Sequence, residues 1–419
     1  MKTTRPLVAV VAAGAAVALA ACGTPSSGGT SSDGGTTVVW DMWASGESDV
    51  EALEAQLAIA REANPDIDIT LKHAPWDDYF TKLTTNLASG DVACVTSMNG
   101  QRLSGYHEAF LPLTEEDLAT AGIDPDDFAA GSFDIMSHDG TLYGIPYDVA
   151  AMLVYYNKDM FAETGTPQPE VGWTFDDFDA AAEGTTTDEH HGFGMSIGEF
   201  QWMSLPIARS GKQPVDESGA LALDDPDFAD GAEWYTDIAD QGFGSVPPSA
   251  AETGWGEQEY QAGNVAMAID GTWNAATYLG NEAGFDAGMV DLPSQDGEHL
   301  GLVLGSGYGI SADCADKEAA LQVLGSLVGE DAQNLIASSG RSYPARTSSQ
   351  PLYFESLDED VRDEVEATFE AAFTGVQGQR STDDWAQINE AISPQIVSVY
   401  TGDTTIGDVL GQAQQQFGE

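Results

Sequence analysis

The segment "TTVVWDMWASGESDVEALEAQLAIAREANPDIDITLKH", residues 36–73, decides the fold. Its first nine residues are rich in β-branched and aromatic side chains and predict a strand. The middle predicts a helix, because Ser48 with Glu51 has the pattern of a capping box, apolar residues share one face, and Asn64 with Pro65 provides a stop. The last eight residues predict a second strand, so the order is strand, helix, strand.

The next residues repeat this order. The stretch "WDDYFTKLTTNLASGD", residues 76–91, predicts a helix that ends at Gly90, and "VACVTSMNG", residues 92–100, predicts a third strand. Strands that alternate with helices of this length indicate a parallel sheet in an α/β lobe. Ligand-facing loops then lie at the carboxyl ends of the strands, here at residues 43–45 and 98–102.

Length and charge limit the remaining possibilities. The chain has 419 residues, and a body of nearly that size is more than one core normally spans, so we expect two lobes. It has 14 Lys and Arg against 69 Asp and Glu, a formal net charge of −55. Such a surface repels nucleic acid and anionic lipid. The acids are interspersed with aromatic and aliphatic residues, which indicates a folded protein with an acidic surface.

The first residues predict export. Two basic residues, an apolar run and small residues at positions 20 and 21 have the layout of a secretory signal covering residues 1–21, and the run is shorter than a transmembrane helix. Residues 22–36 are mostly Gly, Ser and Thr and predict a flexible tether. The sequence Leu-Ala-Ala-Cys at 19–22 resembles a lipobox, which implies lipid on Cys22 and anchoring to the outer face of the cell membrane. The alternative is a buried cysteine in a plain signal peptide.

Four blocks further along carry a second resemblance: "WDDYFTKLTTNLASGDVACVTSMNG" (76–100), "DGTLYGIPYDVAAMLVYYNKDMFAETGTPQPEVGWTFDDF" (139–178), "YQAGNVAMAIDGTWNAA" (260–276) and "GSGYGISADCADKEAALQVLGSLVGEDAQNLIASSGRSYPAR" (305–346). In this order they resemble the signature blocks of the family 1 extracellular solute-binding proteins, the sugar receptors of ABC importers. The family commonly has an Asp where this chain has Ala93 and Cys94.

The resemblance implies a type II periplasmic-binding-protein-like α/β fold, with two lobes, a hinge and a ligand cleft between them. Lobe I would comprise residues 37–147 and 310–350, and lobe II residues 148–309 and 351–419. Crossing strands would fall at 145–151, at 303–311 and near 348–354. The implied protein is a monomeric, extracytoplasmic receptor with a sugar ligand and the transmembrane permease subunits as partners, and it is neither an enzyme nor a user of a cofactor.

A sugar site needs aromatic rings for the C–H faces and polar side chains for the hydroxyl groups. Residues of both kinds fall on the predicted strand-end loops of lobe I, and the resemblance places others in lobe II and at the hinge. The candidate ligand-binding residues are Trp43, Gln101 and Arg102 in lobe I; Glu199, Gln201, Trp202, Trp273 and Trp385 in lobe II; and Asp148, Tyr308, Arg341 and Tyr343 at or near the hinge.

Each of these candidates has an alternative reading. A Trp in an α/β lobe is often a core residue, and Trp76 and Tyr79, which open a helix, are expected to pack. The two arginines could be simple ion-pair partners. Within the receptor class, a polyol, an oligopeptide or a polyamine is the nearer alternative ligand. A secreted glycoside hydrolase that uses Asp148 and Glu199 is the more distant one.

The segment at 188–191, Asp-Glu-His-His, lacks zinc-ligand spacing and predicts a solvated loop, so no metal site is expected. Two cysteines remain after Cys22. Cys94 and Cys314 both lie beside predicted strands of lobe I in an exported protein, which predicts a disulfide between them; two free thiols are the alternative.

Overall fold

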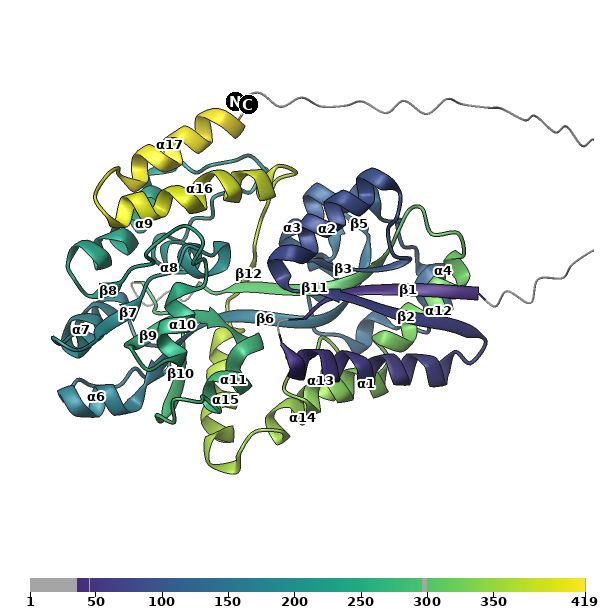
Figure 1. The fold of residues 1–419 in the computed structure, drawn as a ribbon, viewed down its shortest axis with the longest axis horizontal. Helices are drawn as coiled ribbons and strands as arrows, with labels where there is room; N and C mark the ends of the chain where they lie inside the picture. Colours follow the sequence, from purple (N-terminus) through teal and green to yellow (C-terminus); the bar gives the residue numbers. More distant parts are fainter. Residues whose placement is uncertain (1–35, 45, 296–299, 419) are drawn as a thin grey trace, which may run out of the picture. The chain divides into compact units, whose positions relative to one another are not determined.

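The computed structural model describes residues 36–44, 46–295 and 300–418, and Thr36 to Glu419 form one compact unit (Figure 1). The predictions for the signal, for Cys22 and for most of the tether lie outside the described residues. In the described part of the chain, every helix is too short or too polar to cross a membrane.

The first half of the body contains three parallel strands with their helices. Its elements are β1 (Thr36–Trp43), α1 (Glu47–Ala63), β2 (Ile67–Ala74), α2 (Trp76–Ser89), β3 (Val95–Asn99), α3 (Gly100–Tyr106), η1 (His107–Ala109), α4 (Glu115–Ala121), η2 (Pro125–Asp127), α5 (Ser132–Ile135), β4 (Ser137–His138), β5 (Thr141–Leu142) and β6 (Gly144–Asn157).

The remaining elements are α6 (Lys158–Thr164), α7 (Phe175–Thr185), β7 (His191–Gly194), α8 (Glu199–Ser210), α9 (Pro226–Asp240), β8 (Gly244–Ser245), α10 (Trp255–Gln261), β9 (Val265–Gly271), η3 (Thr272–Asn274), α11 (Ala275–Leu279), β10 (Ala287–Asp291), β11 (Leu302–Ile310), α12 (Lys317–Leu327), α13 (Glu330–Ser338), η4 (Thr347–Ser349), α14 (Gln350–Glu355), α15 (Glu359–Ala372), β12 (Gln377–Gly378), α16 (Trp385–Tyr400) and α17 (Ile406–Phe417).

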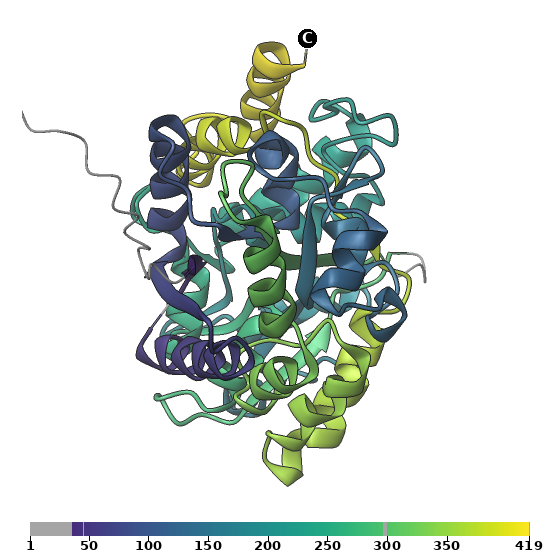
Figure 2. The same ribbon diagram turned by 90° about the vertical axis from the view of Figure 1, so that its right-hand side faces the viewer.

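The parallel sheet predicted for the N-terminal part is present. Strand β1 pairs in parallel with β2 on one side and with β3 on the other. Helices α1 and α2 lie on opposite faces of these strands (Figures 1 and 2). The predicted capping box is wrong: α1 begins at Glu47, before Ser48, and its N-cap Gly46 has no side-chain cap. Because β1 and β3 are parallel neighbours, their carboxyl ends meet at one edge of the sheet, as expected.

Two long antiparallel strands connect the two halves of the body. The first part of β6 pairs with β11, which also pairs with β3, and the second part of β6 pairs with β9 and β10. The sheet therefore runs from β2 to β8 without interruption. The predicted crossing strands at 145–151 and 303–311 correspond to β6 and β11. The segment expected to cross near 348–354 is helical instead, with η4 followed by α14.

Three clusters of buried side chains make up the core. One is built from residues between Val38 and Val149 and between Tyr308 and Ala345, and we call the part around it the first lobe. The other two are built from residues between Ala150 and Leu304 and between Ala337 and Ala413, and we call the part around them the second lobe. The exact lobe boundaries given above stay a prediction.

Cys94 and Cys314 lie next to each other in the first lobe, with sulfur atoms 2.11 Å apart and Cα atoms 4.8 Å apart. We expect the native protein, denatured without reductant, to show no free thiol from these two residues. Because the bridge closes a long loop, replacing both cysteines with Ser should lower the free energy of unfolding by about 2 to 4 kcal/mol. Chemical denaturation measures this, and reduced wild-type protein is the control. Two free thiols would contradict the bridge.

Candidate ligand-binding site

Aromatic rings form the first-lobe side of the candidate site. Trp43, the last residue of β1, meets the Trp76 ring edge-on at 4.9 Å between centroids, and Trp76 meets Phe80 at 4.9 Å. The guanidinium of Arg102 lies 4.3 Å from the Phe80 ring centroid. A cation over the face of a ring is held by the charge distribution of that ring. The rings thus hold a positive charge at the carboxyl edge of the sheet.

The second-lobe side is built from the start of α8 and from η3. Phe200 lies 6.0 Å from Trp273, and the Trp273 ring folds back over Gly271 so closely that a Cβ on this glycine would overlap it. Gly271 therefore leaves the space in which the tryptophan ring lies. Trp273 remains partly exposed, which is the condition that a ring needs to contact a ligand.

The two sides touch each other in this structure. Arg102 forms an ion pair with Glu199 at 3.4 Å, and the rings of Trp76 and Phe200 lie 6.3 Å apart. A row of rings therefore runs from Trp43 through Trp76 and Phe200 to Trp273, from one lobe to the other.

Gln101 adds a second polar link between the lobes. Its amide fits its neighbours when the nitrogen donates to Glu199 Oε1 at 3.2 Å and the oxygen accepts from Trp385 Nε1 at 2.7 Å. Trp385 begins α16 and has only 1% of its surface exposed. Its ring therefore packs as a core residue, while its N–H serves the contact between the lobes.

A groove of about 540 Å³ opens beside these contacts. It lies between α3 and the segment that leads into α16, and Arg102, Tyr106, Asp383 and Trp385 contribute to its walls. This volume lies within the range of small-molecule sites, about 300 to 1,000 Å³. Of the predicted ligand-binding residues, Arg102 and Trp385 line this groove.

Asp148 and Arg341 lie buried at the hinge. The Ser306 N–H donates to Asp148 Oδ1 at 2.7 Å, and Arg341 pairs with Asp49 at 3.4 Å and donates to the Trp43 carbonyl oxygen at 3.4 Å. Burial raises the pKa of Asp148 to about 7, although the Ser306 N–H and the Arg341 charge act in the opposite direction. These two residues contact the backbone next to the site, at Ser306 and Trp43, and do not line the groove.

This pKa predicts how stability depends on pH. In the folded protein Asp148 stays protonated up to about pH 7, whereas its unfolded pKa is 3.8. Its contribution to stability is thus fully present below pH 3.8 and is lost as the pH rises through about 7. We expect Asp148→Asn, which can still accept from Ser306, to gain stability relative to wild type between pH 4 and 7. The gain should be at least about 1.4 kcal/mol, the equivalent of one pKa unit.

Urea unfolding of wild type and Asp148→Asn across this pH range measures the difference between their free energies of unfolding. Because both proteins have the same surface acids, the repulsion among these acids cancels in the difference. Asp177→Asn is the control, because the pKa of Asp177, an exposed cap of α7, is lowered by its hydrogen bonds with Thr174. The stability that comes from this lowered pKa is already present above the unfolded value of 3.8, so the difference between Asp177→Asn and wild type should stay nearly constant between pH 4 and 7. A constant difference between Asp148→Asn and wild type would contradict the assignment.

Gln201 is held by a buried acid of the second lobe. Its Nε2 donates to Asp270 Oδ1 at 3.2 Å, and Asn274 donates to the other oxygen at 2.7 Å. Burial raises the pKa of Asp270, and burial followed by the Asp270 charge raises the pKa of the neighbouring Glu257. Asp270 thus orients Gln201 and Asn274, the residue that follows Trp273.

Two predicted ligand-binding residues lie in the core, and a third, Tyr343, is partly exposed and packs against it. Trp202 and Tyr308 have 0% of their surface exposed: Trp202 packs near Phe228, and Tyr308 stacks on Tyr147. Tyr343 packs among aromatic rings of α14 and α15. The structure therefore places these three rings in packing positions, because neighbouring side chains cover them.

Several residues at the site were not predicted from the sequence. Trp76 was expected to pack in its lobe but contacts Phe200 of the second lobe. It follows β2 directly, at the same sheet edge as Trp43, and this position was an available signal. His107, His138 and Asp383 come together beside the groove but are far apart in sequence and left no local pattern.

The fold and this site define a two-lobe binding protein of the periplasmic-binding-protein type. The sequence profile of the bacterial extracellular solute-binding proteins matches residues 55–369, and the chain belongs to this family. Its members are binding proteins.

Relatives with known ligands are similar over much of the chain. A maltooligosaccharide ABC transporter solute-binding lipoprotein of Streptococcus pneumoniae is 23% identical over 372 residues, 86% of this chain and 84% of that protein. An arabinooligosaccharide-binding protein of Halalkalibacterium halodurans is 26% identical over 60% of this chain and 57% of that protein. An ABC substrate-binding protein of Listeria monocytogenes, solved with cycloalternan, has a TM-score of 0.81 at 22% identity, with 91% of this chain and 98% of that one covered.

Proposed function

We propose that the protein is the extracytoplasmic receptor of an ABC importer and that it binds a sugar, most favourably an oligosaccharide, between its lobes. The observation that carries this proposal is the row of rings from Trp43 to Trp273, which spans both lobes beside the Arg102 and Glu199 pair. Trp76 and Trp273 are the partly exposed rings of this row, and Trp43 and Phe200 are buried behind them. Rings of this kind pack on the C–H faces of pyranoses, and the charged groups pair with their hydroxyl groups. The sugar-binding names of the relatives support the same ligand class.

The receptor would work through closure of its lobes. Arg102 and Glu199 contact each other directly in this structure, so both can exchange this ion pair for hydrogen bonds to sugar hydroxyl groups. A ligand that touches both lobes shifts the equilibrium toward the closed form, because it contacts the second lobe only after closure. The permease would then recognise the closed form.

The test is a calorimetric screen of the purified protein against mono- and oligosaccharides, polyols, short peptides and polyamines. We expect a sugar to bind and to be recovered unchanged after long incubation. Release of new reducing ends, with loss of that activity in Asp148→Asn or Glu199→Gln, would instead identify a glycoside hydrolase. Binding of a peptide or polyamine alone would contradict the sugar ligand.

We further propose that lipid on Cys22 anchors a monomeric receptor to the outer face of the membrane. The lipobox-like residues 19–22 and the tether after them support this. Anchoring would raise the effective concentration of the receptor at its permease. We expect wild type in the membrane fraction and Cys22→Ala in the soluble extracellular fraction of an expressing bacterium. Equal partitioning of the two proteins would contradict the anchor.

A further inference from the structure

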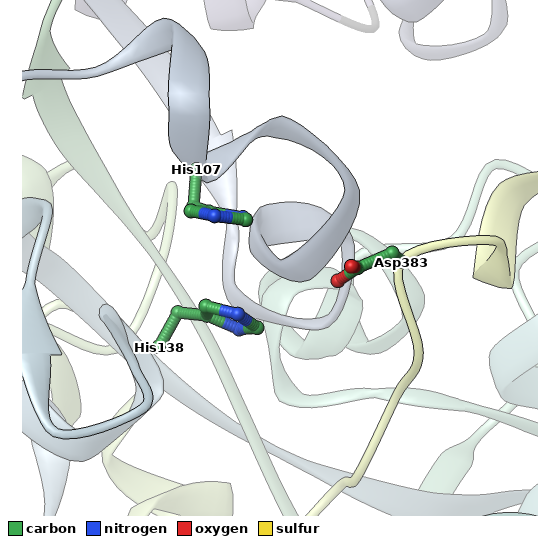
Figure 3. Close-up of side chains that lie close together, drawn as sticks. All are labelled: His107, His138 and Asp383. Atoms are coloured by element: carbon green, nitrogen blue, oxygen red, sulfur yellow. The ribbon is translucent and has the colours of Figure 1, made fainter.

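Two histidines and one aspartate from distant parts of the chain meet beside the groove, whose walls include His107 and Asp383. His107 lies in η1, His138 in β4, and Asp383 just before α16. One ligand atom from each lies within 4.8 Å of the other two (Figure 3). The imidazole rings stack 4.2 Å apart at 21°, and the carboxylate points toward them. The first two residues belong to the first lobe and the third to the second.

Ser104 connects the three side chains. Its carbonyl oxygen lies 2.7 Å from His107 Nδ1, so this nitrogen donates and leaves the lone pair of Nε2 free. Its hydroxyl donates to Asp383 Oδ1 at 2.8 Å and lies 3.4 Å from His138 Nδ1. A histidine that ligates a metal almost always donates its other ring N–H to a carbonyl or carboxylate. His107 already has this arrangement.

The backbone holds the three residues in position. His138 precedes the two-residue turn of Asp139 and Gly140, and both turn residues have positive φ, as a tight hairpin requires. Asp383 is brought to α3 at Gly105, where a Cβ would lie 2.6 Å from the Asp383 carbonyl oxygen. The close approach of the two lobes at this point therefore depends on the missing side chain of Gly105.

We propose that His107, His138 and Asp383 form a binding site for a zinc-like divalent transition metal, which links the two lobes. Two imidazoles with one carboxylate are a zinc ligand set, whereas Ca²⁺ and Mg²⁺ prefer oxygen ligands alone. A tetrahedral ion with bonds of about 2.0 to 2.1 Å places its ligands roughly 3.4 Å apart. The three ligand atoms now lie within 4.8 Å of one another, so binding would require small side-chain movements that bring them closer together. A solvent molecule would complete a four-coordinate site.

The site has a further consequence for solute binding, and this part rests on the proposed receptor function. Because the ligands come from both lobes, the metal favours the arrangement in which the lobes touch. By linkage, the metal then strengthens the binding of any solute that also favours this arrangement, and such a solute strengthens the binding of the metal.

The test uses Zn²⁺ alone, so its outcome does not depend on the sugar proposal. Zn²⁺ is titrated by calorimetry into the purified protein after treatment with EDTA, at an ionic strength that screens the acidic surface. We expect one site per chain, with affinity lowered at least about tenfold in His138→Gln and in Asp383→Asn. Ser104→Ala, which removes the hydroxyl but keeps the carbonyl, should cost about tenfold, as supporting groups of metal sites do.

The matched control is the double variant His190→Gln and His191→Gln, which removes two histidines beside acids at the start of β7 in the second lobe. It should bind Zn²⁺ as wild type does. Circular dichroism melting checks that every variant is folded. Equal affinity in wild type and His138→Gln, or equal loss in the control, would overturn the proposal, because zinc would then be held by other surface groups. Competition by equimolar Ca²⁺ would overturn the choice of metal.

Discussion

Trp273→Ala should weaken sugar binding by roughly 30- to 1,000-fold while the protein stays folded. The ring is partly exposed at the site, lies over Gly271 and contacts Phe200 of α8. Loss of a central aromatic contact in a binding site costs about 2 to 4 kcal/mol, and each 1.4 kcal/mol is about a tenfold change in affinity. Isothermal calorimetry with the sugar found in the screen measures the loss, and Trp273→Phe should restore part of it.

Trp234→Ala is the matched control for this variant. Trp234 is also partly buried, but its N–H donates to Asp179 and its ring packs on Phe175, both in the second lobe. It should keep wild-type affinity. If Trp273→Ala binds as tightly as wild type, or if Trp234→Ala loses binding equally, the Trp273 ring does not contact the ligand.

Trp385→Ala should lower the free energy of unfolding by about 3 to 5 kcal/mol, because removing a buried Trp ring leaves a cavity. The side chain is 1% exposed and belongs to the largest core cluster of the second lobe. The variant also leaves the Gln101 oxygen without the indole N–H. Urea denaturation measures the first effect, and we expect a loss of affinity in the folded fraction from the second.

Trp202→Ala separates the two effects. Trp202 is fully buried in the same cluster, and its ring lies near Phe228 of the second lobe. Trp202→Ala should lose about as much stability as Trp385→Ala, but its folded fraction should keep the wild-type affinity for the sugar. An unchanged melting temperature in Trp385→Ala would contradict the packing described here and would favour a ring that lies free in the cleft.

The first lobe could be predicted because its signals are local. Alternating strands and helices between Thr36 and Asn99 have the parallel order that the sequence indicated. The segment near residue 350 was assigned wrongly to a strand, although Pro351 lies in the first turn of α14, where proline favours a helix. The start of α1 was missed because Ser48 resembled a cap but lies inside the first turn.

From the residues alone, the site could be predicted only where it follows from strand ends, whereas Glu199, Gln201 and Trp273 were predicted from the family resemblance. Trp43 and Arg102 were found from strand ends, because β1 and β3 end there. In α8 the direction of each side chain could not be read, since Phe200, Trp202 and Leu205 are all buried and leave no polar face to set the helical phase. The cluster of His107, His138 and Asp383 could not be predicted at all, because only tertiary packing brings these residues together.

The pairing of β6 with β11 has a mechanical consequence. Opening of the lobes would bend the pair of strands β6 and β11, whose register shifts between Ser306 and Gly307, where β11 also pairs with β3. A β-bulge bends and twists the strand that carries it, and the Asp148 carboxyl group accepts the Ser306 N–H at this point. We therefore expect bending between the lobes to be concentrated at this pair of residues, while the other residues of β6 and β11 stay paired.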